Sequence, residues 1–324
     1  MQDPGDWEFP ENLRPKSNSC EFSLTDKLDA VVKIRSMIPD EAFTADILGT
    51  ERLGSGVVIG SSGLILTIGY LITEARDIWV TTNNDKSVPG HALAYDQTTG
   101  FGLIQALDNL NVPHITIENH QAVKANDRVI LASYGGRRHA LDTNVVKTGE
   151  FAGYWEYVLD NAIFTSPPHP QWGGAALLNS SGNLVGIGSL FLQELFEGQS
   201  QQGNMVVPTS IVFPILDNLI THGHSGAEPR PWLGMYTVES EGKLIVSSLA
   251  HHGPAEISGV AQGDQIIDIN GQAISSLAHL FRSIWSLGAA GVSVPITFIR
   301  DDKKLNITVK SVDRNDYLIK PNFH

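Results

Sequence analysis

The feature that most constrains this chain is a series of short apolar segments across residues 23–224, each bounded by glycine, asparagine or aspartate. The segments are too short for amphipathic helices and are rich in β-branched residues, which is typical of strands. Many short strands without helical patterns between them predict an all-β barrel or sandwich rather than βαβ units. The segments cover residues 31–34, 55–59, 64–68, 78–82, 103–106, 129–132, 157–159, 184–190 and 205–207.

One stretch resembles a membrane span, because residues 53–73 carry no charge. The turn-forming sequence Ser-Ser-Gly at residues 61–63 interrupts the stretch, and β-branched residues are frequent around it. The stretch therefore predicts a β-hairpin.

Composition limits the classes of function. The chain has 324 residues, of which 42% are hydrophobic and 18% charged, so it can bury the cores of two or three soluble domains. A formal net charge of -13 repels phosphate backbones, and nucleic acid is not an expected partner. The single cysteine, Cys20, can form neither an intrachain disulfide nor a cysteine-based zinc site. The N-terminus has no basic start and no apolar core, so no signal peptide is predicted.

Turn-forming residues and changes in composition divide the chain into segments. Proline and asparagine are frequent in the first segment, and glycine and proline mark a linker after the all-β domain. The all-β domain is expected to end in a helix that Thr209 or Ser210 caps. The predicted segments are an N-terminal arm at 1–22, the all-β domain at 23–224, a linker at 225–231, a second domain at 232–315 and a tail at 316–324.

The sequence around Gly173 is similar to a known catalytic loop. Residues 170–179 read Pro-Gln-Trp-Gly-Gly-Ala-Ala-Leu-Leu-Asn. This segment resembles the nucleophile loop of HtrA/Deg-type trypsin-like proteases, in which Asn-Pro-Gly-Asn-Ser-Gly-Gly-Ala-Leu is expected. In this alignment Gly173 takes the place of the nucleophilic serine, and Trp172 takes the place of an asparagine.

The positions of the other two triad residues are changed as well. Residues 53–67 contain the Gly-Ser-Gly and Leu-Thr strands that lead into the catalytic histidine of the family, and Tyr70 then stands at the histidine position. Residues 96–104 read Asp-Gln-Thr-Thr-Gly-Phe-Gly-Leu-Ile and resemble the segment of the catalytic aspartate, whose position holds Gly100. Asp96 is expected to stabilise a turn.

These replacements remove the chemistry that the resemblance implies. Nucleophilic acyl transfer needs an oxygen or sulfur beside a base that a third group orients, and glycine supplies neither. A phenol, with an ordinary pKa of about 10, is a poor general base at neutral pH. The sequence therefore predicts a pseudoprotease without catalytic residues, cofactor or metal. The alternative is an active serine endopeptidase with a rearranged catalytic site.

A rearranged site would need other groups near the lost triad. Trp172 is interpreted either as an indole that occupies the vacated cleft or anchors a ligand, or as simple packing against Pro170 or Phe164. Motif spacing favours loop hydroxyls and surface histidines for the candidate rescue residues, which are Ser133, Tyr134, His139, Ser166 and His169.

The second domain resembles a PDZ domain. Residues 253–260 read Gly-Pro-Ala-Glu-Ile-Ser-Gly-Val, and residues 263–274 read Gly-Asp-Gln-Ile-Ile-Asp-Ile-Asn-Gly-Gln-Ala-Ile. Few other folds use these motifs in this order. The Asn-Gly pair predicts a tight hairpin. The apolar spacing that follows predicts a helix over residues 276–287, capped by Ser275 or Ser276.

Residues 232–235, Trp-Leu-Gly-Met, match the carboxylate-binding loop that opens bacterial-type PDZ domains. In such a loop, backbone N–H groups hold the terminal carboxylate of a peptide that adds a strand to the domain. The alternative is that the protein's own residues fill the site, because tryptophan is large. The resemblance implies a peptide-binding site formed by Trp232, Leu233, Gly234, Met235, Phe281 and Ile284.

Two further patterns carry no expected function. His222 with His224, and His251 with His252, lack a cysteine or acidic partner at a metal-binding spacing, so surface histidines are expected. Residues 288–291 lack the Gly-Lys-Ser/Thr ending of a phosphate loop and predict a turn.

The resemblance covers about residues 31–312 and implies a mainly β fold, a double β-barrel trypsin-like domain followed by an α+β PDZ domain. Members of the family act outside the cytoplasm in protein quality control and form trimers through N-terminal aromatics. Trp7 and Phe9 would take that role here, and a disordered tail is the alternative.

The function that follows is an inactive HtrA-like pseudoprotease that serves as a scaffold, adaptor or chaperone in the periplasm or another extracytoplasmic compartment. Its expected partners are polypeptides or protein C-termini, together with further copies of the chain or an active paralogue. An integral membrane segment is not expected.

Overall fold

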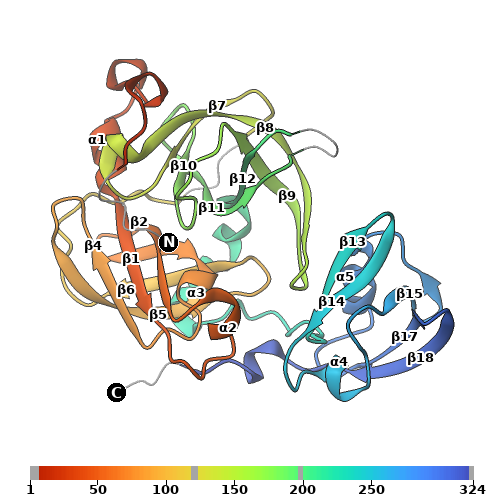
Figure 1. The fold of residues 1–324 in the computed structure, drawn as a ribbon. Coiled ribbons are helices and arrows are strands. Elements are labelled where there is room, and N and C mark those ends of the chain that lie inside the picture. Colours follow the sequence, from red (N-terminus) through yellow and green to blue (C-terminus); the bar gives the residue numbers. More distant parts are fainter. Residues whose placement is uncertain (1–6, 118–122, 196–199, 321–324) are drawn as a thin grey trace. The chain divides into compact units, whose positions relative to one another are not determined.

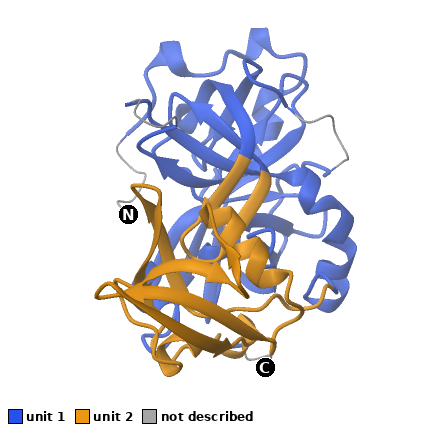
Figure 2. Cartoon of the chain, turned by 90° about the vertical axis from the view of Figure 1, so that its right-hand side faces the viewer, with its two compact units in different colours: residues 1–149, 161–226, 319–324 blue, residues 150–160, 227–318 orange. Residues whose placement is uncertain are grey.

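The computed structural model describes residues 7–117, 123–195 and 200–320. The ends of the predicted arm and tail, residues 1–6 and 321–324, lie outside the described residues. The chain forms two compact units, which Figure 2 colours separately. Unit 1 comprises residues 1–149, 161–226 and 319–324, and unit 2 comprises residues 150–160 and 227–318.

The first half of unit 1 is a closed antiparallel barrel with the strand order β1-β2-β3-β6-β5-β4 (Figure 1). Side chains alternate across each strand, and Ile34, Ile65 and Leu103 are fully buried. The uncharged stretch at residues 53–73 contains most of β2 and all of β3, and the pairing of these strands confirms the predicted hairpin. The strands are β1 (Val31–Met37), β2 (Glu51–Val58), β3 (Leu64–Ile68), β4 (Asp77–Thr81), β5 (Ser87–Tyr95) and β6 (Phe101–Ala106).

The second half of unit 1 is another closed barrel, with the strand order β10-β11-β12-β9-β8-β7. Leu131, Leu177 and Val206 belong to its apolar core. The two barrels confirm the predicted mainly β, double-barrel architecture. The strands are β7 (Arg128–Ala132), β8 (Ala140–Gly153), β9 (Tyr157–Ser166), β10 (Ala176–Leu178), β11 (Leu184–Leu192) and β12 (Gly203–Pro208).

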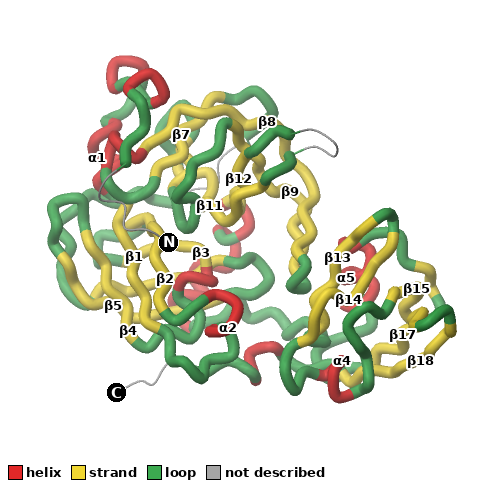
Figure 3. The backbone as a smooth tube through the Cα atoms, in the orientation of Figure 1, coloured by secondary structure: helices red, strands yellow, loops and turns green. Residues whose placement is uncertain are grey.

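Helices in the described part of unit 1 are short and lie in the connections (Figure 3). The predicted start of the closing helix at Thr209 or Ser210 is wrong, because two 3-10 turns precede the α-helix. Pro214 lies in the second turn and lacks the N–H that an α-helix needs. The Thr209 hydroxyl donates to the carbonyl of Leu184 (3.0 Å) and caps nothing. The helical segments are η2 (Glu11–Leu13), η3 (Ser17–Ser19), α1 (Leu24–Asp29), α2 (Ala45–Leu48), η4 (Gly69–Leu71), η5 (Gly136–His139), η6 (Thr209–Ile211), η7 (Phe213–Ile215) and α3 (Leu216–His222).

Unit 2 is a sheet with the strand order β13-β14-β15-β17-β18, so β13 is an edge strand. The Ser276 hydroxyl accepts from the N–H of His279 (3.1 Å), which confirms the predicted helix cap. Asn270 and Gly271 both have positive φ (50° and 78°) between the paired strands β15 and β16, as the tight hairpin requires. The elements are β13 (Met235–Ser240), β14 (Lys243–Leu249), α4 (Pro254–Ile257), β15 (Gln265–Ile269), β16 (Gln272–Ala273), α5 (Leu277–Trp285), β17 (Ser293–Arg300), β18 (Lys303–Lys310) and η8 (Arg314–Asp316).

The tip of the β8–β9 hairpin, residues 150–160, belongs to unit 2, although β8 starts in unit 1 and β9 ends there (Figure 2). Val158 joins the apolar core of unit 2 with Leu233 and Met235. The sequence alone places the whole hairpin in the first domain, because strands keep the same alternating pattern wherever they pack.

The described part of the N-terminal arm packs onto the second barrel. The N–H of Phe9 donates to the carbonyl of Arg138 (3.0 Å), and its buried ring lies 5.0 Å from the ring of His169. Trp7 stacks on His139 with ring centroids 4.8 Å apart. Residues 7–22 are therefore not the disordered tail considered as an alternative.

Candidate functional site

The three positions aligned with a catalytic triad lie together in unit 1. Tyr70 lies in η4, Gly100 precedes β6, and Gly173 lies in the loop before β10. The carbonyl of Gly100 accepts from the N–H of Gly69 (2.7 Å), next to the tyrosine. A Cβ added to Gly173 would lie 2.9 Å from the hydroxyl oxygen of Tyr70. The fold therefore brings positions 70, 100 and 173 to one place.

The hydroxyl of Tyr70 is held by two hydrogen bonds. It donates to the carbonyl of Ser189 (2.9 Å), and the Trp172 side chain hydrogen-bonds to it. Burial raises the pKa of Tyr70 well above its ordinary value, because the charged phenolate would lose its hydration. The side chain is therefore a neutral phenol at physiological pH and cannot act as a general base.

Arg52 fixes the turn that carries Tyr70. Its guanidinium donates to the carbonyls of Tyr70 (2.7 Å) and Thr73 (3.0 Å) and to the hydroxyl of Thr44 (2.7 Å). Burial lowers the pKa of Arg52 to about 10, so it remains charged at neutral pH. Glu74 accepts from the same Thr44 hydroxyl (2.5 Å). The sequence does not predict a role for Arg52 or Glu74, because a buried network of charged and polar groups leaves no local sequence pattern.

Trp172 also contacts a residue that the sequence did not suggest. Its ring lies 5.6 Å from the ring of Phe191 in β11. The carbonyl of Trp172 accepts from the N–H of Ala175 (3.0 Å). The indole thus joins Tyr70 and Phe191 beside position 173.

The backbone donors around Gly173 are partly engaged. In triad enzymes the N–H of the nucleophile and the N–H two residues before it bind the oxyanion. The second of these corresponds to Gln171, whose N–H donates to Nδ1 of His169 (3.0 Å). One of the two oxyanion donors is therefore already bonded within the protein.

The prediction that His169 is a surface histidine is wrong, because the residue is fully buried. Its Nδ1 accepts from Gln171, and its Nε2 donates to the carbonyl of His139 (2.9 Å). Burial lowers the pKa of His169 to about 4, so the imidazole is neutral. With both nitrogens engaged, this histidine is not available as a base.

The other candidate rescue residues are engaged in local contacts. The Ser166 hydroxyl donates to the carbonyl of Gln202 (2.9 Å). The Ser133 hydroxyl lies 3.3 Å from the carbonyl of Tyr134, and both ring nitrogens of His139 face backbone carbonyls. Asp96 accepts from the N–H and hydroxyl of its neighbour Thr99, in keeping with a turn role.

In unit 2, the side chains expected to form a peptide pocket are buried in the core. Leu233, Met235, Phe281 and Ile284 all belong to one apolar cluster. Trp232 is also buried; it pairs with Val312, and its ring lies 4.9 Å from that of Tyr317. Gly234 has a φ of +69°, which glycine adopts without strain.

The backbone N–H groups of the loop at residues 232–235 converge on a carboxylate. Oε1 of Glu156 accepts from Leu233 (3.2 Å), Gly234 (3.0 Å) and Met235 (3.2 Å). The residue is 7% exposed, and burial raises its pKa to about 7 against the lowering effect of the three N–H groups. Glu156 is not predictable from the sequence, because it lies 77 residues before Leu233.

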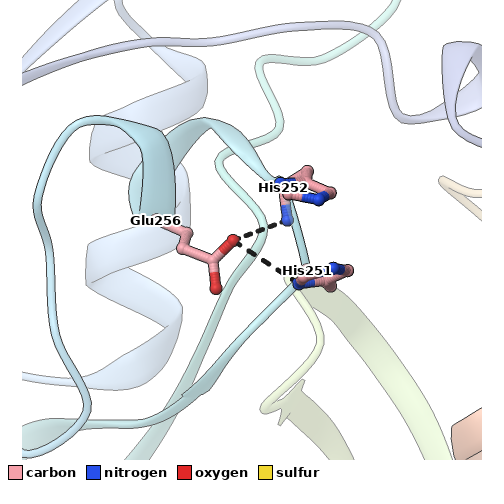
Figure 4. A group of neighbouring side chains, drawn as sticks. All are labelled: His251, His252 and Glu256. Atoms are coloured by element: carbon pink, nitrogen blue, oxygen red, sulfur yellow. Dashed lines mark hydrogen bonds and ion pairs between the residues drawn. The ribbon is translucent and has the colours of Figure 1, made fainter.

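A third cluster corrects the interpretation of one histidine pair. His251 and His252 have an acidic neighbour after all, since ligand atoms of both and of Glu256 lie within 4.8 Å of one another (Figure 4). The backbone N–H of His252 donates to the Glu256 carboxylate (2.6 Å), and Nδ1 of His251 lies 3.8 Å from it. All three are exposed, as surface histidines were predicted to be.

Among the residues that the structure describes, no helix is long and apolar enough to cross a membrane.

Comparison with known proteins agrees with this arrangement of domains. Residues 54–187 match the trypsin-like peptidase domain family, and residues 231–311 match the PDZ domain family. A probable periplasmic serine endoprotease DegP-like of Pseudomonas fluorescens is 26% identical over 283 residues, which are 82% of this chain and 58% of the relative. The serine endoprotease DegS of Salmonella typhimurium is 25% identical over 313 residues, 90% of this chain and 85% of the relative. The chain thus spans little more than half the length of the DegP-like relative.

Solved structures show the same fold. The serine endoprotease from Yersinia pestis is similar with a TM-score of 0.54 at 22% identity, covering 94% of this chain and 99% of that one. The HtrA-type protease AlgW, solved with a tripeptide, is similar with a TM-score of 0.53 at 19% identity, covering 92% of this chain and 97% of that one.

Proposed function

We propose that this chain, an HtrA-type protein with a trypsin-like peptidase domain followed by a PDZ domain, binds polypeptide without hydrolysing it. The observation that carries the proposal is the hydroxyl of Tyr70, which lies 2.9 Å from the point where a Cβ at residue 173 would stand. A catalytic serine has its Cβ at that point. The tyrosine therefore fills space that the nucleophile of a working triad needs.

The neighbouring groups support the same proposal. Gly100 offers no carboxylate, and His169 is a buried neutral imidazole with both nitrogens bonded. The N–H of Gln171 is engaged as well, so acyl transfer would lack a base and one donor for the oxyanion.

The names of the relatives favour a second candidate function, an active serine endopeptidase with a rearranged site. Ser133 and Ser166 are the candidates for the nucleophile that the sequence offers. Both hydroxyls lie close to backbone carbonyls, and neither is paired with a histidine nitrogen in the described contacts.

Labelling with a fluorophosphonate probe separates the two functions, with casein digestion at several pH values as a second measurement. We expect no labelled serine and no digestion in the wild-type protein. The matched variants are Gly173→Ser alone, which keeps Tyr70, and the triple variant Tyr70→His, Gly100→Asp, Gly173→Ser. A specifically labelled serine in the wild-type chain would overturn the proposal.

The binding half of the proposal rests on unit 2. A PDZ domain is a peptide-binding module, and the AlgW structure contains a tripeptide. The edge strand β13 and the loop at 232–235 carry the backbone groups that end recognition uses, and a peptide would have to take the loop N–H groups from Glu156. Fluorescence polarisation with labelled peptides should detect binding to free C-termini and lose it when the peptides are amidated. Equal binding of amidated peptides would refute end recognition.

We further propose a scaffold, adaptor or chaperone role, and we place it outside the cytoplasm because the DegP-like relatives are named periplasmic proteins. Self-assembly or assembly with an active paralogue is part of this proposal. Native mass measurement of the purified chain, with and without cell extract, tests assembly, and fractionation of cells tests the compartment. A monomer found only in the cytosol would contradict both parts.

A further inference from the structure

The carboxylate-binding loop of unit 2 already holds a carboxylate. The N–H groups of Leu233, Gly234 and Met235 all donate to Oε1 of Glu156, at 3.0–3.2 Å. The N–H of Leu233 also lies 3.3 Å from Oε2. Consecutive backbone donors around one carboxylate are the arrangement by which a loop captures the end of a peptide. Here the carboxylate comes from a side chain of the same unit.

The backbone next to Glu156 continues the likeness to a bound peptide. The carbonyl of Tyr154 accepts from the N–H of Thr237 (3.2 Å), a donor of the edge strand β13. Glu156 thus faces Met235, and Tyr154, two residues earlier, faces Thr237, two residues later. The segment therefore runs antiparallel to β13, as an added strand with its carboxylate in the loop does.

The turn itself is held in an unfavourable backbone conformation. Residues 154–156 connect β8 and β9, and Glu156 has a φ of 62°, a region that glycine or asparagine favours. A residue held in such a conformation is a candidate for a functional role, and the hydrogen bonds of Glu156 to the loop N–H groups are the role that the geometry offers.

Two further contacts hold the turn in place. Val158 is buried in the core that contains Leu233 and Met235. Arg282 of α5 forms ion pairs with Glu150 and Asp160, one on each side of the hairpin. The turn is therefore fixed by the loop, the β13 edge and α5, the three elements that surround the expected peptide site.

We infer that residues 154–156 are an internal ligand of the carboxylate-binding loop, and that a protein C-terminus enters the site only by displacing Glu156. This inference rests on the proposed peptide-binding function. The competing ligand is defined by its chemistry, an extended chain that ends in a free carboxylate.

Competition of this kind depends on pH. The charged and titratable groups around Glu156 are Arg314 and Tyr236, and Arg282 faces the same hairpin through Glu150 and Asp160. Burial raises the pKa of Glu156 to about 7, whereas a peptide carboxylate has an ordinary pKa of about 3.5. Between about pH 8 and about pH 6, Glu156 gains a proton and the external carboxylate stays charged. Docked Glu156 therefore holds a proton that the displaced, exposed side chain would release, so acidification favours the internal ligand.

The test uses the full-length protein and three variants. Glu156→Ala removes the carboxylate, and Glu156→Gln removes only its charge. Glu241→Ala is the matched control, because Glu241 also has a positive φ (51°) in a turn between two strands of unit 2 but is exposed. The probe is a pool of short random-sequence peptides, labelled at the N-terminus and carrying a free C-terminal carboxylate, with an amidated pool beside it. Amide hydrogen exchange of residues 233–235 is measured on the same proteins.

We expect Glu156→Ala to bind the free-carboxylate pool at least about tenfold more tightly than wild type and to lose protection of the loop amides. Wild-type binding should weaken from about pH 8 to about pH 6, whereas Glu156→Gln should show little change. The Glu241→Ala protein should match wild type throughout.

Equal, pH-independent binding by wild type and both Glu156 variants would overturn the internal ligand while leaving peptide binding intact. Unchanged protection of the loop amides in Glu156→Ala would overturn it too. If no variant binds either pool, the peptide-binding function fails, and the role of Glu156 as a competitor fails with it.

Discussion

Two side chains determine the chemistry of their surroundings at the scale of single residues. Tyr70 places a neutral hydroxyl beside Gly173, and Glu156 places a carboxylate among the N–H groups of Leu233, Gly234 and Met235. In both places a group of the chain stands where an HtrA-type protein would otherwise present a nucleophile or receive a ligand. The two sites are built from different parts of the sequence and can be tested separately.

The contact between positions 70 and 173 predicts a coupled effect on stability. In wild type, the added Cβ of Gly173→Ala would meet the Tyr70 hydroxyl at 2.9 Å, and we expect a cost of about 1–3 kcal/mol in the free energy of unfolding. In Tyr70→Phe the nearest atom would be the ring carbon at 3.8 Å, which is ordinary contact, so the same substitution should cost little. A double-mutant cycle with denaturant unfolding measures the difference. Additive costs would show that the hydroxyl does not fill this space.

Glu156 predicts a pH dependence of the stability of unit 2. Its pKa is raised from 4.5 to about 7, so in that window the folded protein holds a proton that the unfolded chain releases. The free energy of unfolding should therefore fall as pH rises through the window, by about 3 kcal/mol in total. Denaturant unfolding at about pH 5 and about pH 8 measures the slope, which Glu156→Gln should reduce and Glu241→Gln should keep. A slope that Glu156→Gln leaves intact would assign it to another group.

At the scale of elements, the sequence predicts turns and helix caps formed by neighbouring residues, but it does not predict contacts between residues far apart in the chain. The spacing of turn residues predicts the β2–β3 hairpin, the Asn270-Gly271 turn and the cap of α5, because each depends on neighbours in sequence. The helix α3 begins only at Leu216 because Pro214 lies just before it, whereas the apolar spacing alone predicts an earlier start. The sequence brings Tyr70, Gly100 and Gly173 together only through family resemblance. Contacts such as that of Glu156 with the loop at 232–235 leave no local sequence pattern, so only the three-dimensional structure reveals them.

The cap of α5 gives a prediction for one element. Ser276→Ala removes the hydroxyl that accepts from the N–H of His279, and it should lower the free energy of unfolding of unit 2 by about 1 kcal/mol. Ser275→Ala is the control, because the Ser275 hydroxyl contacts the His279 ring and caps no backbone group. Thermal or denaturant unfolding measures both variants. A larger loss in Ser275→Ala would place the cap one residue earlier.

At the scale of the whole molecule, segments distant in sequence complete each unit. Residues 150–160 complete unit 2, and the N–H of Ile319 donates to Glu74 in unit 1 (2.9 Å). The described part of the N-terminal arm packs on the second barrel through Phe9, more than a hundred residues away in sequence. Whether the arm also joins copies of the chain remains part of the proposal on assembly.

Phe9 predicts how the arm contributes to stability. Its ring is 7% exposed, so Phe9→Ala should lower the free energy of unfolding of unit 1 by about 3 kcal/mol. Phe213→Ala is the control, because Phe213 is 41% exposed and should change stability little. Unfolding curves and native mass are recorded together. A change in mass with no change in stability would show that the arm acts between chains and not within one.

The contact of Tyr70 with position 173 also bears on how such a chain changes over generations. A serine introduced at position 173 brings its Cβ against the tyrosine hydroxyl, so that step is unfavourable while the tyrosine remains. Replacing the tyrosine first loses its hydrogen bond to Ser189. If the chain is non-catalytic as proposed, each single change towards a histidine and serine pair costs stability without restoring activity, so Tyr70 and Gly173 are expected to be kept or exchanged together.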